Sequence, residues 1–436
     1  TRWTGDWSSD VCSSDLIDSC TLTELRGNPR ACIYTEPLWG LSVNLCLPYA
    51  TVYMLAFGMS DTEVGIVSSI YMFSQMISAF LAGPVVDRMG RRKSTALFDF
   101  LSWSVPCLIW AISRNFWYFV VAALFNGLAK IPAVSWDCLL VEDAPKDSIT
   151  YLYSLELIAT NLSALFAPIS SVLVSRLTLV PALRILYMNA FIVMTVKLLL
   201  LYRFSTETKV GRARQEATRG RPLGILLSGY RNAVHKIRAS RGTVFSIIIS
   251  IVVEITSMLG STFWQIIVSR RIGVPDELLP VFPMARNIVS IILFFTVIWR
   301  IRQTNMKVPL YAGFLSSILG CVLLISVKST DFWGYLILSV SIIFEELGGS
   351  MLFTLRESLV AINADPEERS NILAILQTIV MLVSVPFGYI GGFLSDIDRT
   401  LPFVLTIVLL LVGILATFLH YRRNPRTAES TGGMDS

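Results

Sequence analysis

Long apolar segments separated by short polar connections run through almost the whole chain. Twelve such segments can be drawn, at residues 37–58, 62–82, 95–113, 116–140, 152–175, 183–202, 243–268, 278–299, 308–327, 332–354, 371–395 and 401–420. Each is long enough to cross about 30 Å of hydrocarbon as a helix, which satisfies its own backbone hydrogen bonds in lipid. The short alternating segments typical of membrane strands do not recur. We therefore predict an all-α membrane protein with twelve transmembrane helices.

The composition agrees with this pattern. Hydrophobic residues make up 54% of the chain and charged residues 15%, whereas soluble domains have roughly a quarter of their residues charged. The mean hydropathy is +0.63. These values exclude a soluble globular enzyme. We expect a protein that lies in the lipid bilayer, acts as a monomer and has no nucleic-acid partner.

The basic residues are distributed unequally between the two sets of connections. One predicted side holds 23 Lys or Arg residues, including Arg356, and the other side holds seven. Connections on the cytoplasmic side of a membrane carry an excess of Lys and Arg. We therefore predict that both termini and the long middle connection face the cytoplasm, in the plasma (inner) membrane.

The spans divide into two halves around a basic connection. The sequence around Pro145 is weakly repeated around Pro366, which favours two related bundles. The predicted order is an N-terminal segment, a first bundle, a linker, a second bundle and a tail, at residues 17–35, 36–203, 204–241, 242–421 and 422–436. Residues 1–16 look like one reading frame of a sequencing adapter, and we predict that they are a non-native tail.

The linker has two interpretations. Its apolar residues between 223 and 237 fall on one face of a helix, which predicts a helix that lies on the inner leaflet. A solvated connection with the usual positive charge explains the same residues equally well. The sequence leaves both interpretations open.

Residues 83–92 form a dense cationic turn between the second and third apolar segments. The spacing is G-x-x-x-D-R-x-G-R-R, and its residues are Gly83, Asp87, Arg88, Gly90, Arg91 and Arg92. Gly83 would let a helix end approach a neighbour closely, and Gly90 would permit a turn that other residues resist. Asp87 offers an acceptor, while the arginines offer forked donors. Positive charge alone would not require the glycines or the aspartate.

This turn resembles the signature of the loop between helices 2 and 3 in the major facilitator superfamily of secondary transporters. The resemblance implies two pseudo-symmetric bundles of six helices, with helices 1, 4, 7 and 10 along a central path. It also implies that Asp87 rests near the start of helix 11 when the inner side is closed, while Arg88 and Arg91 pair with acids at the end of helix 4. The candidate acids are Asp137, Glu142 and Asp143.

Ionisable residues inside apolar spans, together with polar residues on the same helix face, mark the candidate solute or proton site, because charge is costly in a bilayer unless it faces a cavity or a partner. The candidates are Asn126, Lys130, Glu254, Trp264, Arg286 and Glu346. Glu345 is adjacent to Glu346 and points about 100° away on a helix, so we expect only one of them to face the path. Lys197 is close enough to the end of its span that we expect it to extend to the membrane surface.

The sequence predicts no cofactor and no metal site. Both histidines, His235 and His420, are predicted to lie outside the spans, and no C-x-x-C pair occurs. Phosphate-loop, H-E-x-x-H and G-x-S-x-G motifs are absent, which argues against an enzyme. We predict a secondary transporter of a small polar solute that works by alternating access, with a proton or another ion as a candidate coupling ion. The alternative is a receptor or scaffold with the same fold and no turnover.

Overall fold

The computed structural model describes residues 25–145, 148–219, 241–296, 306–363 and 369–423. Described residues before the linker form α2 Gly27–Cys46, α3 Ala50–Leu55, α4 Asp61–Met89, α5 Arg91–Asp99, α6 Val105–Ala111, α7 Phe116–Asn126, α8 Lys130–Val141, α9 Ile149–Ala164, α10 Pro168–Leu177 and α11 Leu179–Phe204. Those after it form α15 Arg241–Ile266, α16 Val281–Thr296, α17 Lys307–Ser326, α18 Phe332–Asn363, α19 Arg369–Ile397 and α20 Leu401–Arg423. The all-α prediction is confirmed.

Ten helical stretches in the described part of the chain are long and apolar enough to cross a membrane. Two predicted spans fall short of that length. The fifth is divided into α9 and α10 by a turn before Pro168, and the eighth contributes the 16 described residues of α16. Pro48 also interrupts the first span, which changes to a 3₁₀ turn at Leu47–Tyr49, because proline lacks the N–H that a continuous helix needs.

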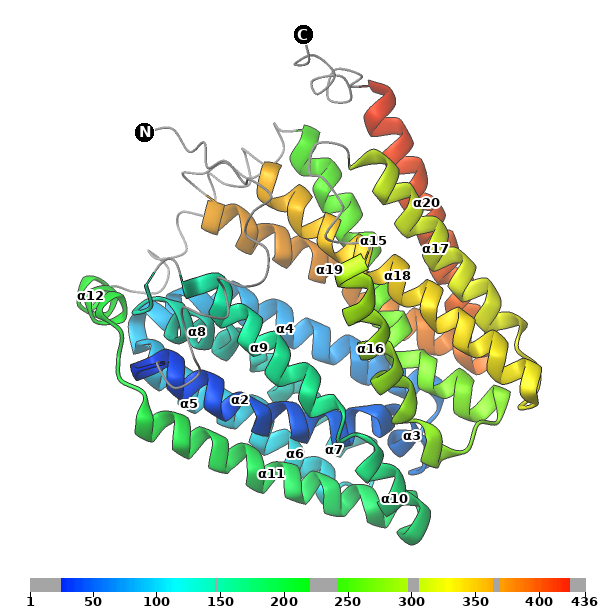
Figure 1. Ribbon diagram of the computed structural model, residues 1–436, viewed down its shortest axis with the longest axis horizontal. Helices are drawn as coiled ribbons and strands as arrows, with labels where there is room; N and C mark the ends of the chain where they lie inside the picture. Colours follow the sequence, from blue (N-terminus) through cyan, green and yellow to red (C-terminus); the bar gives the residue numbers. More distant parts are fainter. Residues whose placement is uncertain (1–24, 146–147, 220–240, 297–305, 364–368, 424–436) are drawn as a thin grey trace.

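The helices form an N-half (α2–α11) and a C-half (α15–α20), drawn in the blue-to-green and green-to-red parts of Figure 1. The main contact between the halves is made by α4 and α19, which lie against each other. We call the end of the molecule with the turn 83–92 the motif end, and the end where α4 begins and α19 finishes the far end.

The buried apolar residues are shared between the halves at the far end and separate at the motif end. One cluster joins Tyr53 and Val64 of the N-half to Phe263 and Leu324 of the C-half. Toward the motif end, Leu139 belongs to a cluster made only of N-half residues. Another cluster, from Phe245 to Leu410, contains only C-half residues. Since close packing of side chains holds helices together in lipid, the two halves are joined at the far end.

The linker is described over α12 Lys209–Thr218, a polar helix that follows α11. Thr208 begins this helix by accepting a hydrogen bond from the backbone N–H of Gly211, as threonine commonly does at a helix start. The amphipathic segment predicted between residues 223 and 237 lies outside the described residues, as do residues 1–16 and His235.

Candidate functional site

A polar clamp joins the halves at the far end. Asp61, the first residue of α4, is buried, and its Oδ2 accepts hydrogen bonds from Ser395 Oγ at 2.7 Å and Arg399 Nε at 3.1 Å. Asp396 of α19 contacts the backbone of α4. Its two carboxylate oxygens accept hydrogen bonds from the N–H groups of Asp61 at 2.9 Å and Thr62 at 3.0 Å. We call Asp61, Thr62, Ser395, Asp396 and Arg399 the far-end clamp.

The Asp396 contact has a physical reason in the helix itself. The first N–H groups of an α-helix have no partner within that helix, and the helix dipole favours negative charge there. Asp396 stands at the end of α19 and supplies that charge to the start of α4. Neither the Asp396 carboxylate nor the α4 N-terminus was singled out from the sequence, because the pairing joins residues more than 330 positions apart.

Glycines bring α4 and α19 close together next to the clamp. A Cβ at Gly388 would lie 2.7 Å from the carbonyl oxygen of Gly65, and one at Gly392 would lie 2.6 Å from the carbonyl oxygen of Asp61. Ser69 Oγ donates to the carbonyl oxygen of Val385 at 2.7 Å. The helices therefore pack backbone against backbone, which is possible only where side chains are absent.

At the motif end, the arginine of the turn is held within the N-half. Arg91 forms an ion pair with Asp87 at 2.8 Å and another with Glu142 at 3.0 Å. The predicted pairing of Arg91 with Glu142 is present. Of the other predicted acids, Asp137 accepts a hydrogen bond from Tyr153 at 2.6 Å, and Asp143 accepts one from Asn28 at 3.1 Å.

The linker covers the turn. Glu207 accepts hydrogen bonds from the backbone N–H groups of Arg91 at 2.8 Å and Arg92 at 3.1 Å, so it supplies the negative charge that the start of α5 favours. In α12, Gln215 donates to the carbonyl oxygen of Met89 at 2.6 Å and Thr218 to that of Asp87 at 3.2 Å. In the described residues, the contacts of the turn are thus made with its own half and the linker.

The two glycines of the turn behave differently. Gly90 has a φ of +86°, which favours glycine, and a Cβ there would lie 2.5 Å from Glu207 and Gln215. Gly83 is exposed, and a Cβ there would meet nothing within 4 Å. The close approach expected at Gly83 is therefore absent in this conformation. Arg88 is exposed as well.

Between the halves, the candidate residues Glu254 and Lys130 come within electrostatic range of each other. Glu254 pairs with Arg356 at 3.0 Å, and Arg356 also pairs with Glu357 at 2.6 Å. Our assignment of Arg356 to a connection was wrong, because α18 continues past it to Asn363. Lys130 belongs to the N-half and lies within electrostatic range of these C-half charges, and no ion pair of Lys130 is found among the described residues.

A second charged cluster lies in the C-half. Arg286 pairs with Glu345 at 2.5 Å and with Glu346 at 2.9 Å, and its guanidinium lies 4.6 Å from the ring centre of Trp264. One arginine thus binds both glutamates, although they point about 100° apart on a helix, and the expectation that only one of them faces the path stays a prediction. Trp264 is 5% exposed, and its indole N–H has no hydrogen-bond partner among the described residues.

Two other predictions need correction. Lys197 is 4% exposed and does not extend to the membrane surface, because it pairs with Glu36 at 3.5 Å and Asp99 at 3.8 Å. Those two acids were missed, since they lie near the ends of their spans and form no motif. His420 lies inside α20, where its ring stacks on Phe245 at 4.0 Å between centroids.

The described helices are those of a multi-pass membrane protein, and comparisons with known proteins place it in a family. The model of the Major Facilitator Superfamily matches residues 39–344. The chain belongs to the major facilitator superfamily. It is a transporter and not an enzyme. No curated protein matches the chain.

Solved structures with the same fold cover nearly the whole chain. The nucleoside transporter NupG superposes with a TM-score of 0.67 at 13% identity, over 91% of this chain and 98% of that chain. The human organic anion transporter MFSD10 (TETRAN) gives 0.63 at 16% identity, over 89% and 98%. A peptide transporter, POT, in complex with sulfate gives 0.65 at 14% identity, over 92% and 95%. At such identities the likeness concerns the fold.

Proposed function

We propose that the chain is a secondary active transporter that moves a small polar solute by alternating access. The observation that supports this most is the far-end clamp, where the halves meet through hydrogen bonds and ion pairs on glycine-lined helices. Opening this end would break these contacts and divide the shared apolar cluster, while the clusters at the motif end, each within one half, would stay intact. A receptor or scaffold needs no contact of this reversible kind.

The α4–α19 pair supports a second, alternate closure. The two helices run in opposite directions, so Asp396 at the end of α19 caps the start of α4. Asp87 stands at the matching place near the end of α4, and α19 begins at the motif end, where the first N–H groups of a helix have no partner within that helix. Closing the motif end would bring Asp87 to that helix start. The described conformation is then the one open at the motif end, which is the cytoplasmic side in our prediction.

The charges between the halves support a polar solute. Lys130 belongs to the N-half, whereas Glu254 and Arg356 belong to the C-half. A solute with an anionic group would approach Lys130, and a donor group on the same solute would approach Glu254. Binding would then bring the halves together, because each half supplies part of the site. Arg286, Glu346 and Trp264 would border the same path.

Two measurements test the proposal. Purified protein is screened by thermal shift against nucleosides, peptides, sugars, amino acids and organic anions, and each solute that raises the melting temperature is tested for counterflow into liposomes. We expect at least one solute to be transported. Glu254→Gln and Lys130→Gln should each reduce that transport by about tenfold or more, because an interaction of about 1.4 kcal/mol corresponds to a factor of ten.

Matched controls keep the result specific. Glu277→Gln and Lys328→Gln remove the same charges in far-end connections, and they should leave transport unchanged. Cysteine accessibility at Ser68, on the contact surface between the halves, reports whether the far end opens. A far end that stays closed under all conditions, together with solute binding but no counterflow, would replace this proposal with the receptor alternative.

A further inference from the structure

A buried cluster in the N-half contains more acid than base. Lys197 of α11 lies between Glu36 of α2 and Asp99 of α5, at 3.5 Å and 3.8 Å from their carboxylate oxygens. The three side chains are 5%, 8% and 9% exposed. If both acids are ionised, the cluster carries one net negative charge. Such a charge is unfavourable in a membrane-spanning bundle unless another positive group arrives.

One of the carboxylate oxygens is left without a donor. Glu36 Oε2 is buried and accepts no hydrogen bond from any described residue, although Lys197 is its ion-pair partner. A buried acceptor without a donor is costly, because it loses the water that it would otherwise bind. A proton on the carboxyl pair removes the excess charge and supplies an O–H donor in the same step.

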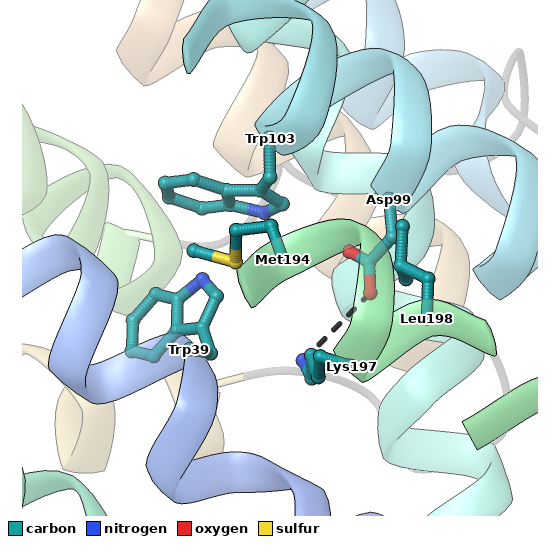
Figure 2. A pocket seen from close by; sticks show the side chains of 6 residues that line it. All are labelled: Trp39, Asp99, Trp103, Met194, Lys197 and Leu198. Carbon is teal, nitrogen blue, oxygen red and sulfur yellow. Dashed lines mark ion pairs between the residues drawn. The ribbon is translucent and has the colours of Figure 1, made fainter. Parts of the chain in front are cut away.

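The surroundings favour a proton over a metal ion. Trp39, Trp103 and Met194 lie on one side of the Asp99–Lys197 pair (Figure 2), and the two indole rings make an edge-to-face contact at 5.4 Å. The space that these residues enclose admits no water-sized sphere. A sodium or calcium ion would need several oxygen ligands, whereas a proton needs only one carboxylate oxygen.

Other titratable groups face the cluster from the helices packed against it. Cys32 of α2 is fully buried beside it, and Glu156 of α9 is half-buried and lies within electrostatic range of Glu36 and Lys197. Asp137 lies within range of Glu156 in turn. These groups add acid and no further base. They also extend the cluster from the buried pair to Glu156, which is partly exposed.

The cluster is connected to both the turn and the site between the halves. Asp99 is the last residue of α5, which begins at Arg91, and it is followed directly by a π-helical segment, Phe100–Ser104. Pro106 cannot donate to the carbonyl oxygen of Ser102, and Asn126 donates to that oxygen at 2.7 Å instead. Asn126 ends α7, and Lys130 begins α8 directly after the 3₁₀ turn Gly127–Ala129. Single π-helical turns are frequent at functional sites.

We propose that Glu36 and Asp99, with Lys197 between them, bind one exchangeable proton, and that this proton is the coupling ion of transport. The proton forms one O–H bond on the carboxyl pair, which changes the charge of the cluster from −1 to zero, and it is released as that bond breaks. The change acts on the start of the π-helical segment and, through the Ser102–Asn126 hydrogen bond, on the helix that carries Lys130. The coupling part rests on the proposed function.

Infrared titration of the purified protein in lipid tests the site without a known solute. As pH falls, the C=O stretching signal of protonated carboxyls in the wild type should exceed the signal of a variant that lacks the site by one group per chain. Asp99→Asn and Glu36→Gln should each remove or shift that component, whereas Glu277→Gln should not. A titration that is the same in the wild type and in both variants, each folded by its thermal melting curve, overturns the proton site.

Transport in liposomes tests the coupling separately. In the wild type, an imposed proton gradient should drive solute accumulation, and Asp99→Asn should lower that accumulation at least about tenfold while exchange without a gradient continues. Accumulation that persists in Asp99→Asn overturns the coupling. If the wild type transports nothing, the proposed function fails instead, and the infrared result still decides the proton site.

Discussion

The two ends of the α4–α19 pair differ in what holds them. At the far end, Asp396 caps the start of α4, Asp61 binds Arg399, and a shared apolar cluster joins the halves. At the motif end, Asp87 binds Arg91 of its own half, and the apolar clusters are separate. The same kind of residue, an aspartate near a helix end, therefore bridges the halves at one end and stays within one half at the other.

This difference shows how the α4–α19 pair can close the molecule either at the far end or at the motif end. A carboxylate at the end of each helix matches the free N–H groups at the start of the other. Only one of the two pairings is made in the described conformation. Substitutions at each end should therefore shift the balance between conformations in opposite directions.

The largest effect is expected where backbones meet. Gly388→Ala places a Cβ 2.7 Å from the carbonyl oxygen of Gly65 and 2.9 Å from the amide nitrogen of Ser69, so α4 and α19 must separate. We expect the far-end closed conformation to lose about 3 kcal/mol, roughly a hundredfold in population. Distances between spin labels at the far end measure the shift. Gly349→Ala, where a Cβ meets nothing within 4 Å, should show none; an equal shift in both variants would contradict the comparison.

The next effect concerns the stability of the motif end. Glu142→Gln removes a partner of Arg91, whose side chain is 6% exposed, and leaves a buried charge with fewer partners. We expect a loss of about 3 kcal/mol in the free energy of unfolding, measured by thermal or denaturant melting. Glu216→Gln, on the exposed side of α12, is the control. Unchanged melting in Glu142→Gln would show that Asp87 alone holds Arg91.

A smaller effect is expected at the far-end clamp. Asp396→Asn removes the negative charge from the start of α4 and should open the far end by about 1 kcal/mol, or about fivefold. The rate of alkylation of Ser68→Cys, in a background without other cysteines, measures the opening. Asp331→Asn is the matched control, since Asp331 caps α18 within one half. Equal alkylation rates in the two variants would remove Asp396 from the clamp.

Asp87→Asn should act in the opposite direction. The variant weakens the pairing proposed for closure of the motif end, so we expect the motif-open conformation to gain about 1 kcal/mol or less and transport to fall a few-fold, with expression unchanged. Transport of a solute found in the thermal-shift screen measures this, and alkylation of Ser68→Cys should be slower than in the wild type. Unchanged transport would remove the gating role of Asp87.

The last effect is local and depends on pH. Asp398 accepts hydrogen bonds from the backbone N–H and the hydroxyl of Thr400, both at 2.8 Å, and these hold the pKa of its carboxyl below the usual value. A lowered pKa means that the contribution to stability is complete above the unfolded-state pKa, about 3.9, and is lost as pH falls through the folded pKa. Asp398→Ala should lower stability by about 1 kcal/mol at neutral pH. The difference should shrink in acid, and a constant difference in melting temperature would contradict this.

Much of this protein followed from its sequence because the relevant constraints are local. A run of apolar residues must be helical in lipid wherever it lies, which fixed the all-α membrane fold. The spacing of the turn identified Gly90, whose positive φ is a property of one residue. The family resemblance implied that Arg88 and Arg91 pair with acids at the end of helix 4, and it left Asp137, Glu142 and Asp143 as the candidates. The length of the spans was less certain, as the continuation of α18 past Arg356 shows.

The tertiary structure decided which charges meet, because those partners come from different helices. Nothing near Lys197 in the sequence indicates Glu36 or Asp99, and nothing near Asp61 indicates Asp396 or Arg399. The spacing of Glu345 and Glu346 on one helix predicts that they point in different directions. Arg286 comes from another helix and binds both. Buried charge is tolerated only with a partner, and the partner is chosen by the packing of the helices, which a linear pattern does not contain.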